Sequence, residues 1–315
     1  MKLEKILLDE KKSDVSLTAF ILDDSQEMLN GKPRPAVLIC PGGAYMYCSD
    51  REAEPVALRF AAMGYHAFVL RYSTYKEGEP GFVDLEKPMP PKPDRIYPTQ
   101  IREIAMAMKY IADKAEDWRV ERGKIILCGF SAGAHNCALY ATNWHRPIIQ
   151  DYLAYAEDVL RPAAVILGYT LSDFVFMRDK SSESEFAKIF FDASCMALLG
   201  TTEADQAGLE SVSPAGLVSE KTPPMFLWAT AEDNLVPVQH SIRMANALAE
   251  HRVPFELHIF ENGGHGLALA SQATAYAKTQ VSAPAAQWIQ MAESWLMTRF
   301  SLELKDHEDI PGGAH

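Results

Sequence analysis

Long apolar runs, paired cysteines and an excess of basic residues are all missing from this sequence. No stretch approaches the roughly 18 uninterrupted apolar residues that a membrane-spanning helix requires. The first residues, Met-Lys-Leu-Glu-Lys, lead straight into mixed charged sequence and not into a targeting segment. We therefore expect no membrane partner and a cytoplasmic location.

The shortage of basic residues excludes a second class of partner. The chain has 30 Lys and Arg against 42 Asp and Glu, which gives a formal net charge of -12. A chain of that charge repels phosphate backbones and anionic lipids unless it carries a local basic patch, and we find no such patch. We therefore expect no nucleic-acid partner.

The cysteines indicate neither a disulfide framework nor a metal site. Their number is odd, no C-x-x-C pair occurs, and no histidine stands at zinc-site spacing. We predict reduced, mostly buried thiols, with no metal and no cofactor. The residues are Cys40, Cys48, Cys128, Cys137 and Cys195.

The hydrophobic content, in contrast, is that of a folded α/β protein. With 315 residues, 48% of them hydrophobic, the chain can bury one large core, or at most two modest ones. Short β-branched runs alternate with helical patterns, which predicts a mostly parallel sheet with helices on both faces. We expect parallel strands at 36–40, 66–71, 124–128, 163–168, 225–229 and 255–260, and helices at 54–63, 98–114, 132–142, 238–251 and 285–299. Segments 5–8 and 15–22 are expected to add antiparallel edge strands, which makes about eight strands.

Two insertions interrupt this alternation. Residues 75–97 are rich in proline and charge, and residues 172–224 contain a helical piece around 183–199. Because pockets in open α/β sheets form from the loops at the carboxyl ends of the strands, we interpret both as walls of a pocket. The last segment, 305–315, lacks apolar periodicity and is expected to be disordered.

The strongest chemical signal is Gly129-Phe130-Ser131-Ala132-Gly133, which follows an apolar strand and precedes a helix. This is the G-x-S-x-G nucleophile elbow in its required context. Side chains at the glycine positions would collide with the adjacent strand and helix. The motif alone is common by chance, but its place after the third parallel strand favours Ser131 as a nucleophile.

A serine nucleophile needs a base and a group that orients the base, in the chain order acid and then histidine. Asp233 follows the strand at 225–229, and the Asp-x-x-Val-Pro pattern favours it over its neighbour Glu232. His265 follows the last strand within a glycine-flanked loop. The other histidines considered are on predicted helices or strands and are weaker candidates: His135, His240, His251 and His258.

The loop after the first parallel strand, Cys40-Pro41-Gly42-Gly43-Ala44-Tyr45, has the composition of an oxyanion hole. A tetrahedral intermediate needs preoriented N–H donors for its negative charge. We assign the N–H groups of Gly43, Ala44 and Ala132 to that role. A simple glycine turn is the structural alternative.

Just downstream, Ser49-Asp50-Arg51-Glu52 has the S-x-x-E form of a helix capping box. We prefer that interpretation over a binding role for Arg51 or Glu52. Three tyrosines nearby, Tyr45, Tyr47 and Tyr72, are candidates for the acyl pocket, although aromatic residues near a sheet edge more often serve packing.

With these motifs in place, the chain resembles the bacterial α/β-hydrolase esterases of the hormone-sensitive-lipase-like group, and most closely the carboxylesterases described as acetyl-xylan-esterase-like. The resemblance runs from about residue 34 to 300. It departs from the His-Gly-Gly-Gly form of the oxyanion loop, because Pro41 replaces the histidine and Ala44 the third glycine. It implies hydrolysis of short acyl esters, often acetyl groups on sugars, without a cofactor. We expect one α/β-hydrolase domain over 1–304. Since family members are often oligomeric, a homo-oligomer stays open.

The leading hypothesis is a serine carboxylesterase acting on a small-molecule ester through an acyl-enzyme on Ser131. A thioesterase or a serine peptidase would use the same triad, and a non-catalytic ligand-binding member of the fold is the alternative from another class. Halide-removing relatives would need Asp at the elbow, and dienelactone-hydrolysing relatives Cys.

Overall fold

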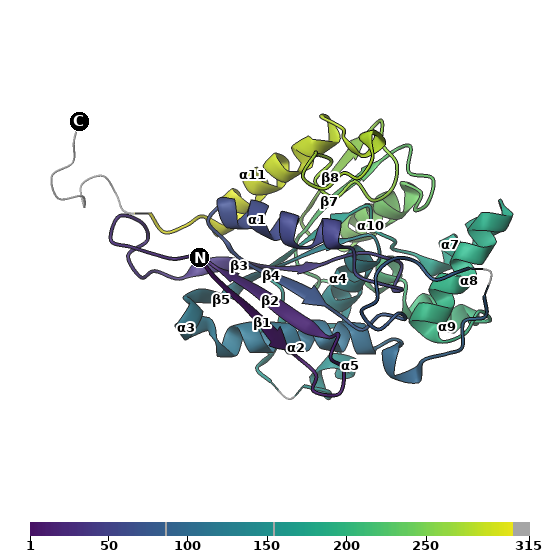
Figure 1. Cartoon of the computed structure of the whole chain (residues 1–315), viewed down its shortest axis with the longest axis horizontal. Helices are drawn as coiled ribbons and strands as arrows, with labels where there is room; N and C mark the ends of the chain where they lie inside the picture. The colour runs from purple at the N-terminus through teal and green to yellow at the C-terminus, as the bar shows by residue number, and fades with distance from the viewer. Residues whose placement is uncertain (86, 154, 305–315) are drawn as a thin grey trace.

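A single twisted sheet organises the chain, with helices on both of its faces (Figure 1). The computed structural model describes residues 1–85, 87–153 and 155–304, so the predicted disordered tail lies outside the described residues. The eight strands lie in the order β1-β2-β4-β3-β5-β6-β7-β8. They are β1 (Lys2–Leu7), β2 (Ser16–Ile21), β3 (Arg34–Cys40), β4 (His66–Arg71), β5 (Val120–Phe130), β6 (Ala164–Gly168), β7 (Met225–Thr230) and β8 (Phe255–Phe260).

The pairing of the strands confirms the predicted mostly parallel sheet. β1 pairs with β2, and β2 with β4, in antiparallel fashion, whereas every pairing from β4 across to β8 is parallel. Central strands such as β3 and β6 are buried along their whole length, because helices cover both faces. The carboxyl ends of the parallel strands therefore meet at one edge, where loops from distant parts of the sequence come together.

The main helices form the two outer layers. Phe60 of α1 and Trp288 of α11 belong to the core on one face of the sheet. Ile104 of α2, Cys137 of α4 and Met244 of α10 belong to the core on the other face. The helices are α1 (Glu54–Ala62), α2 (Thr99–Asp113), α4 (Ala132–Asn143), α10 (Gln239–Glu250) and α11 (Trp288–Phe300).

The second insertion folds into helices that gather at one end of the molecule (Figure 1). These are α7 (Phe174–Ser181), α8 (Glu185–Leu199), α9 (Gln206–Ser211) and the 3-10 turn η3 (Pro214–Leu217). The predicted helical piece corresponds to α8, which begins after Ser184 because the serine side chain accepts a hydrogen bond from the N–H of Ala187. Among its described residues, the first insertion contains one helical element, the 3-10 turn η2 (Pro93–Arg95).

The differences from the predicted elements lie at the element ends and in short helices. β5 begins at Val120 and not at residue 124, because Val120 pairs with Arg34 of β3; the register then shifts, and pairing resumes at Ile125 opposite Ala36. The predicted helix at 285–299 opens instead with a 3-10 turn, η5 (Ala285–Gln287), before α11. The remaining short helices, α3 (Ala115–Trp118), α5 (Pro147–Gln150) and α6 (Glu157–Leu160), are too brief to show apolar periodicity.

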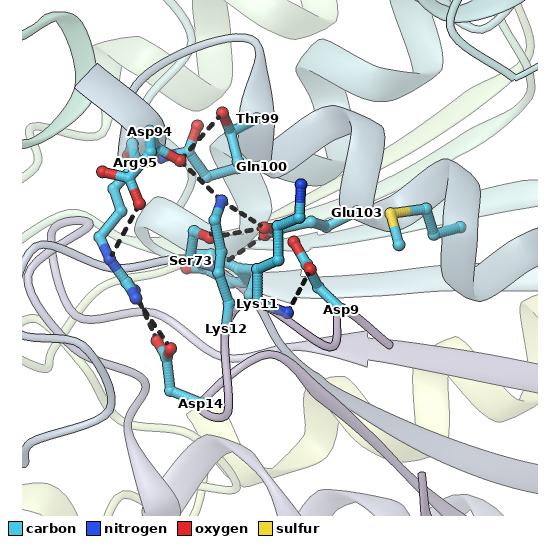
Figure 2. A network of polar contacts seen from close by, with 12 residues as sticks. Asp9, Lys11, Lys12, Asp14, Ser73, Asp94, Arg95, Thr99, Gln100 and Glu103 are labelled. Carbon is cyan, nitrogen blue, oxygen red and sulfur yellow. Dashed lines mark hydrogen bonds and ion pairs between the residues drawn. The ribbon is translucent and has the colours of Figure 1, made fainter. Parts of the chain in front are cut away.

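A polar network fastens the β1–β2 hairpin to the rest of the fold (Figure 2). The ammonium group of Lys12 donates to the hydroxyl of Ser73 at 3.1 Å and lies 3.5 Å from the carboxylate of Glu103 on α2. That carboxylate also accepts from the backbone N–H of Ser73 at 2.6 Å. Beside it, the guanidinium of Arg95 forms a bidentate ion pair with the carboxylate of Asp14, with N–O distances of 2.6 and 2.9 Å. The edge strands are thereby held against the end of β4.

Among the helices of the described residues, none is long and apolar enough to cross a membrane.

Candidate active site

Ser131 lies on a sharp turn between β5 and α4. Its φ of 52° is in the left-handed region, where a residue with a side chain costs roughly 1–3 kcal/mol. The turn requires glycine nearby, since a Cβ on Gly133 would lie 2.0 Å from the carbonyl oxygen of Cys40 on the neighbouring strand. The structure therefore confirms that a side chain at this glycine position would collide with the adjacent strand. Ser131 stands at the positive N-terminal end of α4.

Ser131, His265 and Asp233 form a hydrogen-bonded chain. The hydroxyl of Ser131 donates to Nε2 of His265 at 2.8 Å, and Nδ1 of that imidazole donates to Oδ2 of Asp233 at 2.7 Å. The aspartate is buried, and its Oδ1 accepts from the backbone N–H groups of Leu235 at 3.0 Å and Val236 at 2.9 Å. These bonds fix the carboxylate at the end of β7, so that it can orient the imidazole and stabilise its protonated form.

Glu232, the rival of Asp233, has a different partner. Its carboxylate accepts from the N–H of Gly263 at 3.0 Å and so braces the loop that carries His265. The hydroxyl of Thr230 donates to the carbonyl of the same glycine at 2.7 Å. Asp233 therefore contacts the imidazole of His265 directly, whereas Glu232 holds the backbone of the loop that carries His265.

The other histidines do not contact Ser131 through a hydrogen bond within the described residues. His135 donates from Nε2 to the carbonyl of Val212 at 2.7 Å and accepts at Nδ1 from the hydroxyl of Tyr45 at 2.5 Å. Burial lowers the pKa of His135 to about 4, so it is neutral at pH 7. Burial likewise lowers the pKa of His240 to about 3. His251 and His258 lie at the end of α10 and on β8.

The N–H groups of Gly43 and Ala44 are available to a ligand. Within the part of the chain that the structure describes, no hydrogen bond uses either of them. The N–H of Ala132 belongs to the first turn of α4, where helical N–H groups have no carbonyl one turn earlier. Gly43, Ala44 and Ala132 all line cavities that also contain Ser131. The arrangement can therefore present backbone donors beside the serine hydroxyl.

Two cavities of unequal size meet at Ser131. The smaller has a volume of about 20 Å³, little more than one water-sized group needs. Its walls are mostly apolar, and the second insertion contributes Phe174, Phe190 and Ser194 to them. The other lining residues are Ala44, Tyr45, Ala132, His135, Leu171 and Val236. The larger has a volume of about 270 Å³ and a mixed lining that includes Tyr47, Ser49, Arg51, Phe82, Tyr276 and Gln280. Phe82 comes from the first insertion, so both insertions contribute to the site.

The three tyrosines divide between the cavities and the core. Tyr45 lines the small cavity and Tyr47 the large one. Tyr72 is not among the lining residues of either, and its hydroxyl donates to the carbonyl of Pro41 at 2.6 Å. It therefore holds the backbone of the loop that carries Gly43 and Ala44.

The capping-box interpretation of residues 49–52 is wrong. Ser49 makes no side-chain capping bond, and Asp50–Glu52 form a 3-10 turn ahead of α1. The carboxylate of Glu52 points into the protein and accepts from the backbone N–H of Gly42 at 2.7 Å. The local spacing matches a capping box, but the partners that decide the side chain's direction are distant in sequence.

Comparison with protein families gives two matches. The BD-FAE family model matches residues 89–248, which span the elbow and the aspartate. The dienelactone hydrolase family model matches residues 208–298. That second match begins beyond Ser131, so it covers the acid and the histidine but not the nucleophile.

Individual proteins agree with these matches. The chain is 32% identical over 238 residues to endo-1,4-beta-xylanase B of Butyrivibrio fibrisolvens, which covers 76% of this chain and 33% of that one. Across four curated relatives, the chain spans between 33% and 54% of their length.

Solved structures match over nearly the whole chain. The carboxylesterase Cest-2923 of Lactobacillus plantarum has a TM-score of 0.75 at 28% identity, covering 97% of this chain and all (100%) of that one. An acetyl ester-xyloside bifunctional hydrolase of Caldicellulosiruptor lactoaceticus has a TM-score of 0.69 at 30% identity, covering 94% and 96%. These matches confirm the α/β-hydrolase fold.

Proposed function

Because this chain belongs to the BD-FAE family and is an esterase-type α/β hydrolase, we propose that it hydrolyses short acyl esters, chiefly acetyl esters of sugars, through an acyl-enzyme on Ser131. The observation that carries the proposal is the hydrogen-bonded chain from Asp233 through His265 to Ser131, at 2.7 and 2.8 Å. Nucleophile, base and orienting carboxylate are the parts that acyl transfer by serine requires.

In the first half of the reaction, Ser131 Oγ bonds to the ester carbonyl carbon while His265 Nε2 takes the hydroxyl proton. The carbonyl oxygen becomes an oxyanion, which the N–H groups of Gly43, Ala44 and Ala132 stabilise. The bond from carbon to the alcohol oxygen then breaks, and the imidazolium returns its proton to the departing alcohol.

In the second half, a water molecule gives a proton to His265 and adds to the acyl carbon. The bond to Ser131 Oγ breaks, the serine regains its proton, and the free acid leaves. Asp233 stabilises the imidazolium in both halves without becoming protonated itself.

The small cavity supports a short acyl group. Its volume of about 20 Å³ suits a methyl group, whereas each further methylene would have to displace the surrounding side chains. Phe174 and Phe190, both buried, form much of this wall. We therefore assign the small cavity to the acyl group and the large one to the alcohol.

The large cavity supports a sugar as the alcohol. Sugars present hydroxyl edges and apolar ring faces, so they suit sites that mix hydrogen-bonding and aromatic side chains. Arg51 and Gln280 supply polar groups there, and Tyr276 is 81% exposed beside them, with the guanidinium of Arg51 5.2 Å from its ring centre. The similarity to a xylanase and to an acetyl ester-xyloside hydrolase gives independent support.

The variant Ser131→Ala tests the nucleophile. With p-nitrophenyl acetate, we expect kcat to fall by about 10⁴-fold, the scale of losing a triad serine. Ser294→Ala, at an exposed position on α11, is the matched control and should retain wild-type turnover. Retained activity in Ser131→Ala would contradict the proposal.

A substrate panel tests the alcohol. We expect acetylated xylose and xylo-oligosaccharides to be hydrolysed with higher kcat/KM than acetyl-CoA or a peptide ester. A preference for acetyl-CoA would favour a thioesterase, and cleavage of peptides would favour a serine peptidase.

A further inference from the structure

Glu52 is a buried carboxylate next to the active site that the reaction just described does not use. It is 3% exposed. One carboxylate oxygen accepts from the backbone N–H of Gly42 at 2.7 Å, and the other accepts from the hydroxyl of Tyr169 at 2.5 Å. Burying a carboxylate is costly, and burial raises the pKa of Glu52 above its ordinary value. A glutamate whose only role was to cap a helix could stay exposed to solvent, so the burial of Glu52 indicates another role.

The first partner of Glu52 places it under the oxyanion loop. Gly42 directly precedes Gly43, whose N–H is one of the proposed oxyanion donors. A Cβ on Gly42 would lie 2.5 Å from the carbonyl oxygen of Phe130, 2.8 Å from Cβ of Ser131 and 2.9 Å from the Glu52 carboxylate. Gly42 is thus packed closely between the turn that carries Ser131 and the side chain of Glu52. The hydrogen bond from Gly42 to Glu52 fixes the position of this loop relative to Ser131.

The second partner connects Glu52 to the histidine loop. Tyr169 follows β6, and its hydroxyl accepts from the backbone N–H of Ala268 at 3.0 Å while it donates to Glu52. Its ring lies edge-on to the imidazole of His265, with 5.0 Å between the ring centres. The same tyrosine therefore touches the base directly and holds the backbone three residues beyond it.

Arg51 completes the connection from the other side. Its guanidinium donates to the carbonyl of Gly266 at 2.7 Å and to that of Thr274 at 2.5 Å. Gly266 directly follows His265. Arg51 and Glu52 are thus neighbours in one short turn. Arg51 holds the loop of His265, and Glu52 holds the oxyanion loop and, through Tyr169, the end of β6.

We propose that Glu52 and Tyr169 are positioning residues that act as one unit, fixing the backbone donors of the oxyanion loop and the imidazole of His265 relative to Ser131. The inference rests on the proposed function. Glu52 also borders the large cavity, but Gly42 and Tyr169 occupy both of its carboxylate oxygens, so its effect is on the geometry of the groups that act on the substrate. Misplacement of catalytic groups by about 1 Å can cost on the order of 10²-fold in rate, so a unit of this kind matters for turnover.

Two conservative variants separate this role from simple structural support. Glu52→Gln keeps the size of the side chain and one accepting oxygen, but its amide nitrogen cannot accept the second hydrogen bond. Tyr169→Phe keeps the ring against His265 and loses only the hydroxyl. Glu54→Gln, at an exposed position two residues from Glu52, is the matched control and should behave as wild type.

The measurement is turnover of p-nitrophenyl acetate per active site, with sites counted by fluorophosphonate labelling of Ser131. We expect kcat per labelled site to fall by about 10- to 100-fold in both variants, with KM within about threefold of wild type. The double variant should lose little more than the worse single one, because residues acting as a unit are non-additive.

Unchanged kcat per labelled site would overturn this inference alone, even where fewer sites are labelled, since that is the pattern of a purely structural role. Losses that multiply in the double variant would also overturn it. A wild-type chain that is not labelled at Ser131 would instead contradict the proposed function, and this inference with it.

Discussion

The acyl-chain preference of the enzyme should depend on Phe190. This side chain is 6% exposed and forms a wall of the small cavity, whose volume is about 20 Å³. A butyryl ester brings two methylenes more than an acetyl ester into that space. Forcing extra methylenes into a packed site costs about 1–3 kcal/mol, so we expect wild-type kcat/KM for butyrate to be about 30-fold below that for acetate.

Phe190→Ala removes the wall and should raise the ratio of butyrate to acetate kcat/KM by about 30-fold, since it relieves that cost. The assay is hydrolysis of p-nitrophenyl acetate and butyrate by the same preparation, so that the ratio is independent of the active fraction. Phe191→Ala is the control: it removes a buried phenyl from the same helix, but Phe191 does not line the cavity. A ratio that does not change in Phe190→Ala, or a wild-type preference for butyrate, would refute the assignment of the acyl site.

Two further predictions concern the acid and the polar network of Figure 2. Asp233→Asn should lower kcat by about 10³-fold or more, as loss of the orienting carboxylate does in serine hydrolases, whereas Glu232→Gln should lower kcat far less. Equal losses of kcat for the two variants in steady-state assays would contradict the assignment of Asp233 as the orienting carboxylate. Lys12→Met should lower the free energy of unfolding at pH 7 by about 2 kcal/mol in urea titrations, with exposed Lys11→Met as the unaffected control. Burial already raises the pKa of Glu103, so the native state holds that proton more tightly than the unfolded chain, and stability from this group falls as pH rises. Loss of Lys12 raises the pKa of Glu103 further, so the difference in unfolding free energy between wild type and Lys12→Met should become smaller toward pH 4. A difference that became larger at pH 4 would contradict this reasoning.

The fold was predictable because its signals are local and repeated. Most parallel strands contain a short apolar run, and segments with helical periodicity alternate with them outside the two insertions, so the order of elements along the chain favours a mostly parallel sheet. The beginning of β5 escaped prediction for the opposite reason. Its polar residues look like a turn, and only the pairing of Val120 with Arg34 makes them a strand.

The residues of the hydrogen-bonded chain, Ser131, His265 and Asp233, were also predictable from the sequence, since the elbow motif and the order of acid and histidine restrict the choice to a few positions. Glu52 was not. Its partners Gly42 and Tyr169 are 10 and 117 residues away, and a four-residue pattern that matches a capping box gives no information on contacts at that separation. The sequence predicted that the second insertion would form a pocket wall, but not that Phe190 would be part of it, because the direction of that side chain depends on how the insertion folds back over the sheet.

The central claim is that the hydroxyl of Ser131 is activated by His265, and covalent labelling of Ser131 by an irreversible inhibitor tests this most directly. Wild-type protein treated with a fluorophosphonate should gain a single adduct by intact-mass measurement, located on Ser131 by peptide mapping, and Ser131→Ala should gain none. His265→Ala should be labelled far more slowly than wild type. An adduct on another residue, or labelling of wild type no faster than of His265→Ala, would contradict the account.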